Sequence, residues 1–174
     1  MIDTLRKAQR GLDGINAWIG PAIAWFTLAT VVVTFLVVVL RYGFDLGWIA
    51  MQESVTYLHA TVFMVGAAYT LQRDAHVRVD IFYRKFGPRG RAWVDLLGTV
   101  LFLFPLCVFL IWSSWDYVRV SWLLQEGSRE AGGLPGVYLL KTLIPLMSVL
   151  LIVQGLAILA GSLVTIASRE KKGA

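Results

Sequence analysis

Four long apolar runs account for half of this 174-residue chain and constrain what it can fold into. They cover residues 21–40, 49–71, 96–115 and 143–166. A helix needs roughly 20 apolar residues to cross a hydrocarbon core of about 30 Å, and every run is long enough. Backbone inside a membrane must satisfy its own hydrogen bonds, which favours helices over open strands. The sequence therefore predicts an all-α integral membrane protein with four transmembrane helices.

The charge distribution predicts the orientation of these helices. Hydrophobic residues make up 57% of the chain and charged residues 16%, against about 25% charged in an ordinary soluble domain. Most basic residues fall in the N-terminal segment, the connection 72–95 and the tail: Arg6, Lys7, Arg10, Arg73, Arg78, Arg84, Lys85, Arg89, Arg91, Arg169, Lys171 and Lys172. By the positive-inside rule, both termini and that connection are cytoplasmic. The net charge of +5 then reflects topology and contact with membrane lipids. No nucleic-acid partner is expected, because no basic groove with stacking aromatics is visible.

Three segments are predicted along the chain. Residues 1–20 have apolar residues at helical spacing and basic residues between them, which suits an amphipathic helix in the cytoplasmic interface. The alternative is a frayed basic tail, because Gly11 and Gly14 each weaken a helix by about 1 kcal/mol. Residues 21–167 form the four-helix membrane domain, and residues 168–174 a cytoplasmic basic tail. The first run is longer than the apolar region of a cleaved signal peptide, so we expect it to be retained.

Ionisable residues inside a membrane are candidates for function. His59 lies near the middle of the second run. It is either a proton relay, which would need an acidic partner at similar depth, or the donor of an interhelical hydrogen bond, which the sequence favours because no such acid is present. Glu53 lies near the outer interface, either solvated or paired with Arg41 or Lys141. Cys107 stands alone among apolar residues and is expected to fill space, which leaves no disulfide, thiol-redox or zinc site.

Other residues are expected to act structurally. Arg91 and Asp95 have the spacing of helical neighbours, and His76 and Asp80 have the same spacing in the second connection. Gln154 is a candidate for an interhelical hydrogen bond. Two prolines, Pro105 and Pro145, lie inside apolar runs and are expected to kink their helices, with the opening of a site as the less favoured alternative. The outer connection 116–142 is long, and long loops are often functional.

The order of these signals resembles the small membrane subunit of tripartite ATP-independent periplasmic (TRAP) transporters, the DctQ-like family. The resemblance extends from about residue 20 to residue 160, and residues 1–16 and 168–174 contribute nothing to it. The residues that carry it are Arg41-Tyr42, Trp48, Glu53, Gly66-Ala67-Ala68, His76 to Asp80, Ser121-Trp122, Glu126, Ser128, Gly133-Leu134-Pro135, Lys141, Ile144-Pro145 and Gln154-Gly155.

This resemblance implies a bacterial inner-membrane location, no cofactor and two protein partners. One is a large polytopic TRAP membrane subunit that holds the substrate and sodium sites. The other is a periplasmic solute-binding protein that delivers an organic acid-like solute. The small subunit is then a scaffold that anchors the large one. The implied partner contacts are Arg41, Trp48, Glu53 and Lys141 at the outer side, with Glu126, Ser128 and Glu130 facing the receptor. His76 and Asp80 would order the cytoplasmic connection.

Three classes of function are open to a chain of this kind. The first is the scaffold subunit of a secondary transporter. The second is a self-sufficient, multidrug-type exporter that works as a homodimer through Glu53 or His59, for which Glu53 is too shallow. The third is a membrane enzyme, which would need a nucleophile or metal cluster that the sequence lacks. The sequence favours the scaffold and predicts no catalytic residues.

Overall fold

The computed structural model describes residues 2–77 and 80–170, leaving aside the side chains of residues 169 and 170. Arg78, Lys171 and Lys172 of the predicted basic segments lie outside the described residues. The described chain consists of helices joined by short connections. In chain order the elements are α1 (Ile2–Gly43), α2 (Ile49–Gln72), the 3₁₀ turn η1 (Tyr83–Lys85), α3 (Pro88–Gly98), the π-helical segment η2 (Thr99–Leu103), α4 (Phe104–Leu123) and α5 (Val137–Glu170).

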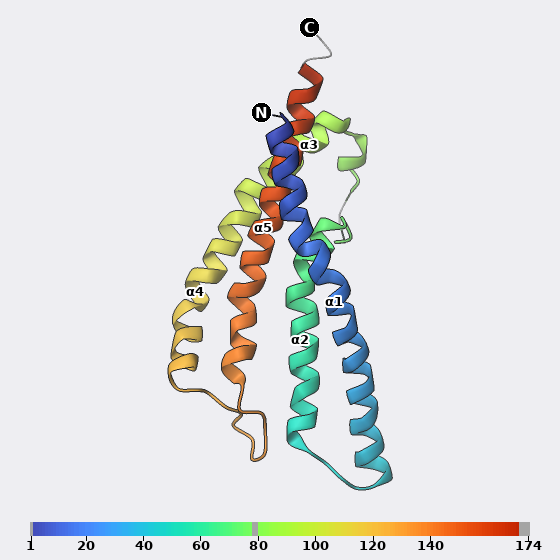
Figure 1. Cartoon of the computed structure of the whole chain (residues 1–174), viewed down its shortest axis with the longest axis vertical. Helices are drawn as coiled ribbons and strands as arrows, with labels where there is room; N and C mark the ends of the chain where they lie inside the picture. Colours follow the sequence, from blue (N-terminus) through green and yellow to red (C-terminus); the bar gives the residue numbers. More distant parts are fainter. Residues whose placement is uncertain (1, 78–79, 171–174) are drawn as a thin grey trace.

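The helices form an elongated up-and-down bundle (Figure 1). The start of α1, the end of α5 and the described parts of the connection between α2 and α3 lie towards one end of it, here called the terminal end. The connections 44–48 and 124–136 lie at the opposite end, here called the loop end. Helix α5 is central, because it packs against α1, α2, α3 and α4. The charge pattern predicts this arrangement, in which the start of α1, the end of α5 and the connection after α2 lie towards the same end.

Three helical stretches of the described chain are long and apolar enough to cross a membrane. They are Ile2–Gly43, Pro88–Leu123 and Val137–Ser168. Helix α2 is not among them, although its 24 residues match the second predicted run, because polar residues such as Glu53 and His59 lower its hydropathy. The structure thus supports a membrane protein with three clear spans, and the crossing by α2 stays a prediction.

The N-terminal segment is not a separate helix, in contrast to the predicted boundary at residue 20. Residues 2–20 form the first half of α1, which has 42 residues and continues through Pro21 without interruption. At 1.5 Å per residue α1 is about 60 Å long, about twice the thickness of a hydrocarbon core. A Cβ atom added to Gly20 would clash with the ring of Tyr69. This close approach of α1 to α2 lies next to Pro21 and fixes the two helices there.

Pro105 disturbs its helix in a specific way. A proline has no N–H to donate, and its ring crowds the carbonyl four residues earlier, here that of Leu101. The π-helical turn Thr99–Leu103 includes that carbonyl and connects α3 to α4. Such turns insert one extra residue into a helix without breaking it. The kink predicted at Pro105 is therefore accommodated as a π-turn, and α3, η2 and α4 run on as one stretch.

Most buried side chains of the bundle are small and about half of them are polar, whereas many large apolar side chains are exposed on its outside. Ala68, Cys107, Ser148 and Ala157 are at most 1% exposed, whereas Trp112 is 78% exposed. A soluble protein shows the reverse pattern. Small interior residues let membrane helices approach closely while large apolar side chains face lipid or a partner. Cys107 fills interior space as predicted.

Candidate functional site

The loop 124–136 is held in a defined shape by its own backbone. The N–H of Ser128 donates to the carbonyl of Leu134 at 2.9 Å, and the N–H of Val137 donates to the carbonyl of Glu126 at 3.0 Å. Gly132 has a φ of 80°, a conformation that glycine adopts without steric cost. These contacts close the loop on itself at the loop end of the bundle.

This loop is shorter than the connection 116–142 expected from the sequence. Helix α4 continues to Leu123 and α5 begins at Val137, so polar residues expected in the loop are helical. Two groups of side-chain contacts then attach the loop to the bundle. We call them the Glu53 clasp and the Glu126 clasp.

The Glu53 clasp fixes the loop to α2. The carboxylate of Glu53 accepts hydrogen bonds from the hydroxyl of Ser128 and, at 2.7 Å, from the backbone N–H of Leu134. Ser128 also accepts a hydrogen bond from the N–H of Glu130 at 3.1 Å. A Cβ atom added to Gly133 would come within 2.8 Å of Glu53 Oε2. The Gly133 position therefore needs glycine, and both oxygens of Glu53 are used inside the chain.

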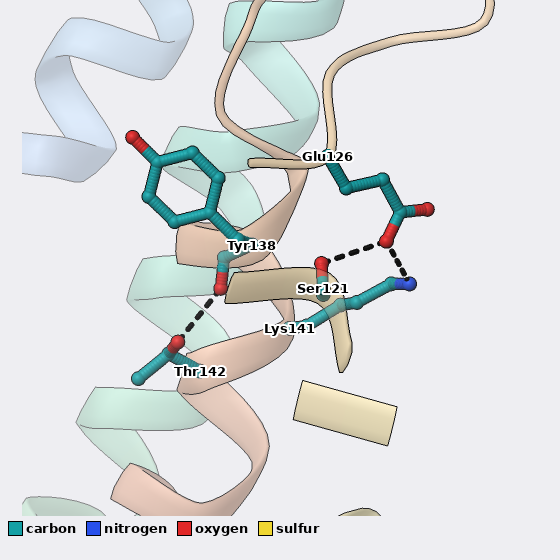
Figure 2. A network of polar contacts seen from close by, with 5 residues as sticks. All are labelled: Ser121, Glu126, Tyr138, Lys141 and Thr142. Carbon is teal, nitrogen blue, oxygen red and sulfur yellow. Dashed lines mark hydrogen bonds and ion pairs between the residues drawn. The ribbon is translucent and has the colours of Figure 1, made fainter. Parts of the chain in front are cut away.

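The Glu126 clasp fixes the loop to α4 and α5 (Figure 2). Glu126 Oε2 accepts a hydrogen bond from Ser121 Oγ at 2.7 Å and from Lys141 Nζ at 2.5 Å. Lys141 Nζ also lies 3.8 Å from the ring centre of Tyr117, within the range of a cation–π interaction. The Lys141 side chain is only 12% exposed. A well-covered cation is thus satisfied by one carboxylate and one aromatic ring.

The charge on Glu126 is stabilised by these neighbours. Its pKa is lowered mainly by the hydrogen bond from Lys141, then by the hydrogen bond from Ser121, and further by the positive charges of Lys141 and Arg129. Desolvation opposes the shift but does not outweigh it. Glu126 is therefore ionised at neutral pH and acts as a fixed negative charge, with no role as a proton donor.

Aromatic and hydroxyl side chains extend the second clasp. Trp122 Nε1 donates to Thr142 Oγ1 at 2.8 Å, and the Trp122 and Tyr138 rings meet edge to face with centroids 4.6 Å apart. Figure 2 also shows the hydroxyl of Thr142 donating to the carbonyl of Tyr138, at 2.7 Å. Beneath the loop, the hydroxyl of Tyr57 is buried and has no hydrogen-bond partner among the described residues. Sequence reasoning missed Tyr57, because nothing in its spacing distinguishes it from an interfacial aromatic.

The residues predicted to contact partners divide into two groups. Glu53, Glu126, Ser128 and Lys141 turn inward and form the two clasps, as the contacts above describe. The others, Arg41, Trp48 and Glu130, have exposed side chains, and Trp48 is 64% exposed. A pocket of about 340 Å³ is lined by residues 47–51 and by Ala131 and Gly132, so the exposed Trp48 adjoins the tip of the clasped loop.

His59 does not make the interhelical hydrogen bond that the sequence favoured. Its side chain is exposed on α2, and no hydrogen bond to it is formed within the described part of the chain. Thr56 and Phe63 are exposed on the same side, three residues before and four residues after it. This outward face of α2, defined by Thr56, His59 and Phe63, presents an unsatisfied imidazole at the middle of the helix.

The polar residues predicted at the other end order the 73–87 connection. His76 Nε2 lies 3.2 Å from the carbonyl of Ala67, and Asp80 forms an ion pair with Arg84 at 3.7 Å. His76 and Asp80 therefore take separate partners.

Arg91 and Asp95 likewise turn away from each other. The guanidinium of Arg91 donates to the carbonyls of Phe86 and Arg84. The hydroxyl of Tyr83 instead shares its single hydrogen between the two carboxylate oxygens of Asp95, at 2.9 and 3.0 Å. Arg91 thus stabilises the turn before α3, and Asp95 ties α3 to η1.

A buried polar network joins α1, α2 and α5 towards the terminal end. Asn16 Nδ2 donates to Gln154 Oε1 at 2.9 Å, Gln154 Nε2 donates to the Asp13 carboxylate at 3.0 Å, and Gln72 donates to the Asp13 carbonyl at 2.5 Å. Asn16 and Gln154 are 1% and 3% exposed. The interhelical role predicted for Gln154 is confirmed. The role of Asn16 was missed because Asn16 lies in the segment expected at the membrane surface.

Comparison with known proteins identifies relatives. The family described as "Tripartite ATP-independent periplasmic transporters, DctQ component" matches residues 30–165. A Haemophilus influenzae protein named as a TRAP transporter small permease is 32% identical over 90 residues, which cover 52% of this chain and 55% of the relative. The C4-dicarboxylate TRAP transporter small permease protein DctQ of Vibrio cholerae is 28% identical over 95 residues, which cover 55% of this chain and 40% of the relative. The chain thus spans about half the length of these curated relatives, or less. No solved structure matches it.

Proposed function

Because this chain belongs to the DctQ components of the TRAP transporters, as a small permease subunit, we propose that it acts as a fixed scaffold in such a transporter. It anchors a large polytopic membrane subunit and contributes to docking of a periplasmic solute-binding protein. The complete transporter couples import of an organic acid-like solute to sodium. The protein lies in the bacterial inner membrane with both termini in the cytoplasm, in line with its basic terminal end.

The observation that supports this proposal is that its charged side chains are bound by other groups of the same chain. A solute carrier needs polar groups near mid-membrane that are free to bind and release. Here Glu53, Glu126 and Lys141 are all occupied by contacts within the chain. They hold a loop in place and are unsuited to exchanging partners with a solute. This arrangement favours a rigid platform over a moving transport element, and it also argues against the alternative of a self-sufficient homodimeric exporter working through Glu53.

The clasped loop supplies a docking surface for the solute-binding protein. The two clasps hold this loop in place, while Arg41 near the end of α1, Trp48 just before α2 and Glu130 in the loop have exposed side chains. A surface whose backbone is already ordered loses little conformational entropy when a partner binds. The exposed charges and the aromatic ring are residue types suited to a reversible protein contact.

The outward face of α2 is the surface that we assign to the large subunit. An imidazole facing hydrocarbon is costly, and polar side chains in membrane helices usually pair with a neighbouring helix. His59 has no such neighbour within the described residues, so a helix of the large subunit that offers a hydroxyl, carbonyl or carboxylate fits there. Thr56 and Phe63 extend the same face.

Reconstitution tests the proposal. Liposomes that contain this chain alone, or this chain with the co-encoded large membrane subunit, are supplied with the solute-binding protein, a sodium gradient and labelled organic acids. We expect sodium-dependent uptake only when both membrane subunits are present. Uptake by this chain alone would contradict the scaffold role and support the exporter.

A pair of variants tests the α2 face. His59→Leu should leave the thermal midpoint of the isolated chain unchanged, because the side chain has no partner there, but it should reduce co-purification of the large subunit. Ser113→Leu, an exposed polar position on α4, is the matched control and should co-purify normally. Equal recovery of the large subunit with both variants would show that this face of α2 does not contact it.

A further inference from the structure

A basic groove lies between α1, α3 and α5 at the terminal end of the bundle. It has a volume of about 720 Å³, and in Figure 1 the first turns of α1, the short α3 and the last turns of α5 lie at this end. Arg6 and Arg10 line it from α1, and Arg91 lines it from α3. Neither the proposed scaffold role nor the two clasps involve this groove.

The arginines of the groove retain free hydrogen-bonding capacity. Arg10 donates its Nε to the carbonyl of Arg6 at 3.4 Å, and Arg91 uses Nε and Nη2 on the carbonyls of Phe86 and Arg84. A guanidinium has five N–H donors, so each keeps donors to spare. No carboxylate among the described residues forms an ion pair with any of the three.

Among the described residues, Asp95 is the one acidic residue that lines the groove, and its two oxygens share the single hydrogen of the Tyr83 hydroxyl. The three arginines outnumber this one carboxylate, so the groove keeps a net positive charge. An anionic group bound between the arginines would neutralise that excess.

Ser162 gives an independent indication of a ligand. It is 7% exposed and lines the same groove from α5, and its hydroxyl makes no hydrogen bond to the described part of the chain. Other hydroxyls of α5 do find partners in their own helix, as Ser148 does on Ile144 and Thr165 does on Gly161. The Ser162 oxygen is not among the fully buried, unpartnered polar atoms of the described residues, so it reaches the open groove. The Ser162 hydroxyl is therefore a donor that is available inside an arginine-lined cavity.

Part of the groove wall is apolar, formed by Ala92, Ile158 and Val164. A soluble phosphate would use the polar part of this groove alone, whereas a phospholipid would use both parts.

We propose that this groove binds an anionic phospholipid, with its phosphate held by Arg6, Arg10 and the Ser162 hydroxyl and its acyl chains against the apolar walls. Basic pockets between membrane helices on the cytoplasmic side suit such headgroups. The bound lipid would join the first half of α1 to α3 and α5. This inference requires that the chain lie in a membrane, and it does not depend on the scaffold role.

Lipid titration of the purified full chain tests the site. The chain is delipidated in detergent, and binding of phosphatidylglycerol and of phosphatidylcholine with the same acyl chains is followed by native mass spectrometry. We expect phosphatidylglycerol to bind at least tenfold more tightly. Arg6→Gln combined with Arg10→Gln should weaken it by about fivefold per arginine, the equivalent of about 1 kcal/mol for each basic residue near a membrane surface. Ser162→Ala should weaken it several-fold without a change in helix content.

Matched controls separate the site from general charge attraction. Arg119→Gln combined with Arg129→Gln removes the same charge from exposed positions near the end of α4 and in the loop 124–136 and should leave binding unchanged. Equal weakening by both pairs of substitutions, or equal binding of the two lipids, would overturn the proposal. Competition by soluble glycerol phosphate would assign the groove to a free phosphate compound in place of a lipid. Because the readout is lipid binding, it is independent of transport.

Discussion

Gly133 lies beside the hydrogen bond between the Ser128 hydroxyl and the Glu53 carboxylate. A methyl group at this position would come within 2.8 Å of Glu53 Oε2, and the shift needed to avoid it would break hydrogen bonds of the Glu53 clasp. Losing these hydrogen bonds to a charged group would release the loop from α2. The loop is therefore sensitive to a change of this single residue, Gly133.

We predict that Gly133→Ala releases the loop without unfolding the bundle. Trypsin can cut after Arg129, which is exposed in the loop, and the cut should become faster by roughly tenfold, because local opening of the loop makes the peptide bond accessible. Gly127→Ala is the control, because its added Cβ would meet Pro135 at 3.5 Å, an ordinary contact. Equal cleavage rates of the two variants would show that the Gly133 contact does not hold the loop.

The Glu126 clasp predicts a pH dependence of stability. The pKa of Glu126 is lowered in the folded protein by the hydrogen bond from Lys141 and then by that from Ser121. A lowered carboxyl pKa stabilises the fold above the unfolded value, about 4.3 for glutamate, and this stabilisation is lost as the pH falls through the folded pKa. The thermal midpoints of the wild type and Glu126→Gln should therefore differ at pH 7 and converge below pH 4.

The control for this pH series is Glu130→Gln. Glu130 has an exposed side chain in the same loop, so its substitution removes one negative charge without touching the clasp. Its thermal midpoint should follow that of the wild type at every pH. If Glu126→Gln and Glu130→Gln gave the same profile, the ion pair with Lys141 would contribute nothing to stability.

At the scale of elements, α1 and α5 are joined through a buried polar network rather than an apolar seam. Asn16 and Gln154 hydrogen-bond to each other with both side chains almost fully buried. Farther towards the terminal end, a Cβ added to Gly161 would meet Gln9 Nε2 at 2.9 Å, so the helices are in close contact there too. Removing one partner of a buried hydrogen bond leaves the other unsatisfied, whereas replacing both with apolar groups can be nearly neutral.

A double-substitution series tests this network. Asn16→Leu and Gln154→Leu should each destabilise the chain by about 1–3 kcal/mol, measured as the free energy of unfolding in mixed detergent. The double variant should be more stable than the sum of the single effects predicts. Thr34→Val on the exposed side of α1 is the control and should have little effect. Strict additivity would mean that the two amides do not act together.

At the scale of the whole molecule, α1, α2, the continuous stretch α3–η2–α4 and α5 alternate in direction, which brings the start of α1 and the end of α5 to one end. Cysteine labelling can test which side of the membrane that end faces, since Cys107 is fully buried and can be replaced by alanine. In that background, Glu130→Cys should react with a membrane-impermeant maleimide in intact cells, and Lys7→Cys only after lysis. Labelling of Lys7→Cys in intact cells would reverse the proposed orientation.

The amino-acid sequence by itself determined the helical class, the approximate helices and the side on which the basic residues gather. Run length and hydropathy are local properties, so the apolar runs mark helices whatever packs around them. Helix ends were less well predicted. The loop 124–136 proved shorter than expected, because residues at membrane interfaces are polar whether they lie in a helix or in a connection.

Only the tertiary structure decided which way the polar residues face. In α1 the sequence suggested an amphipathic segment with its apolar side on the membrane surface. In the bundle Asn16 is buried against α5, while Ile15 is 47% exposed. In a membrane, apolar side chains gain little free energy by packing inside the bundle, because lipid is equally apolar. Polar side chains turn inward because they find hydrogen-bond partners there. Glu53, Glu126 and Lys141 found theirs within the chain, and His59 was left facing outward. The hydrogen-bond partner of a polar group is set by residues distant in sequence. Hydropathy is a local property and does not show which residues these are.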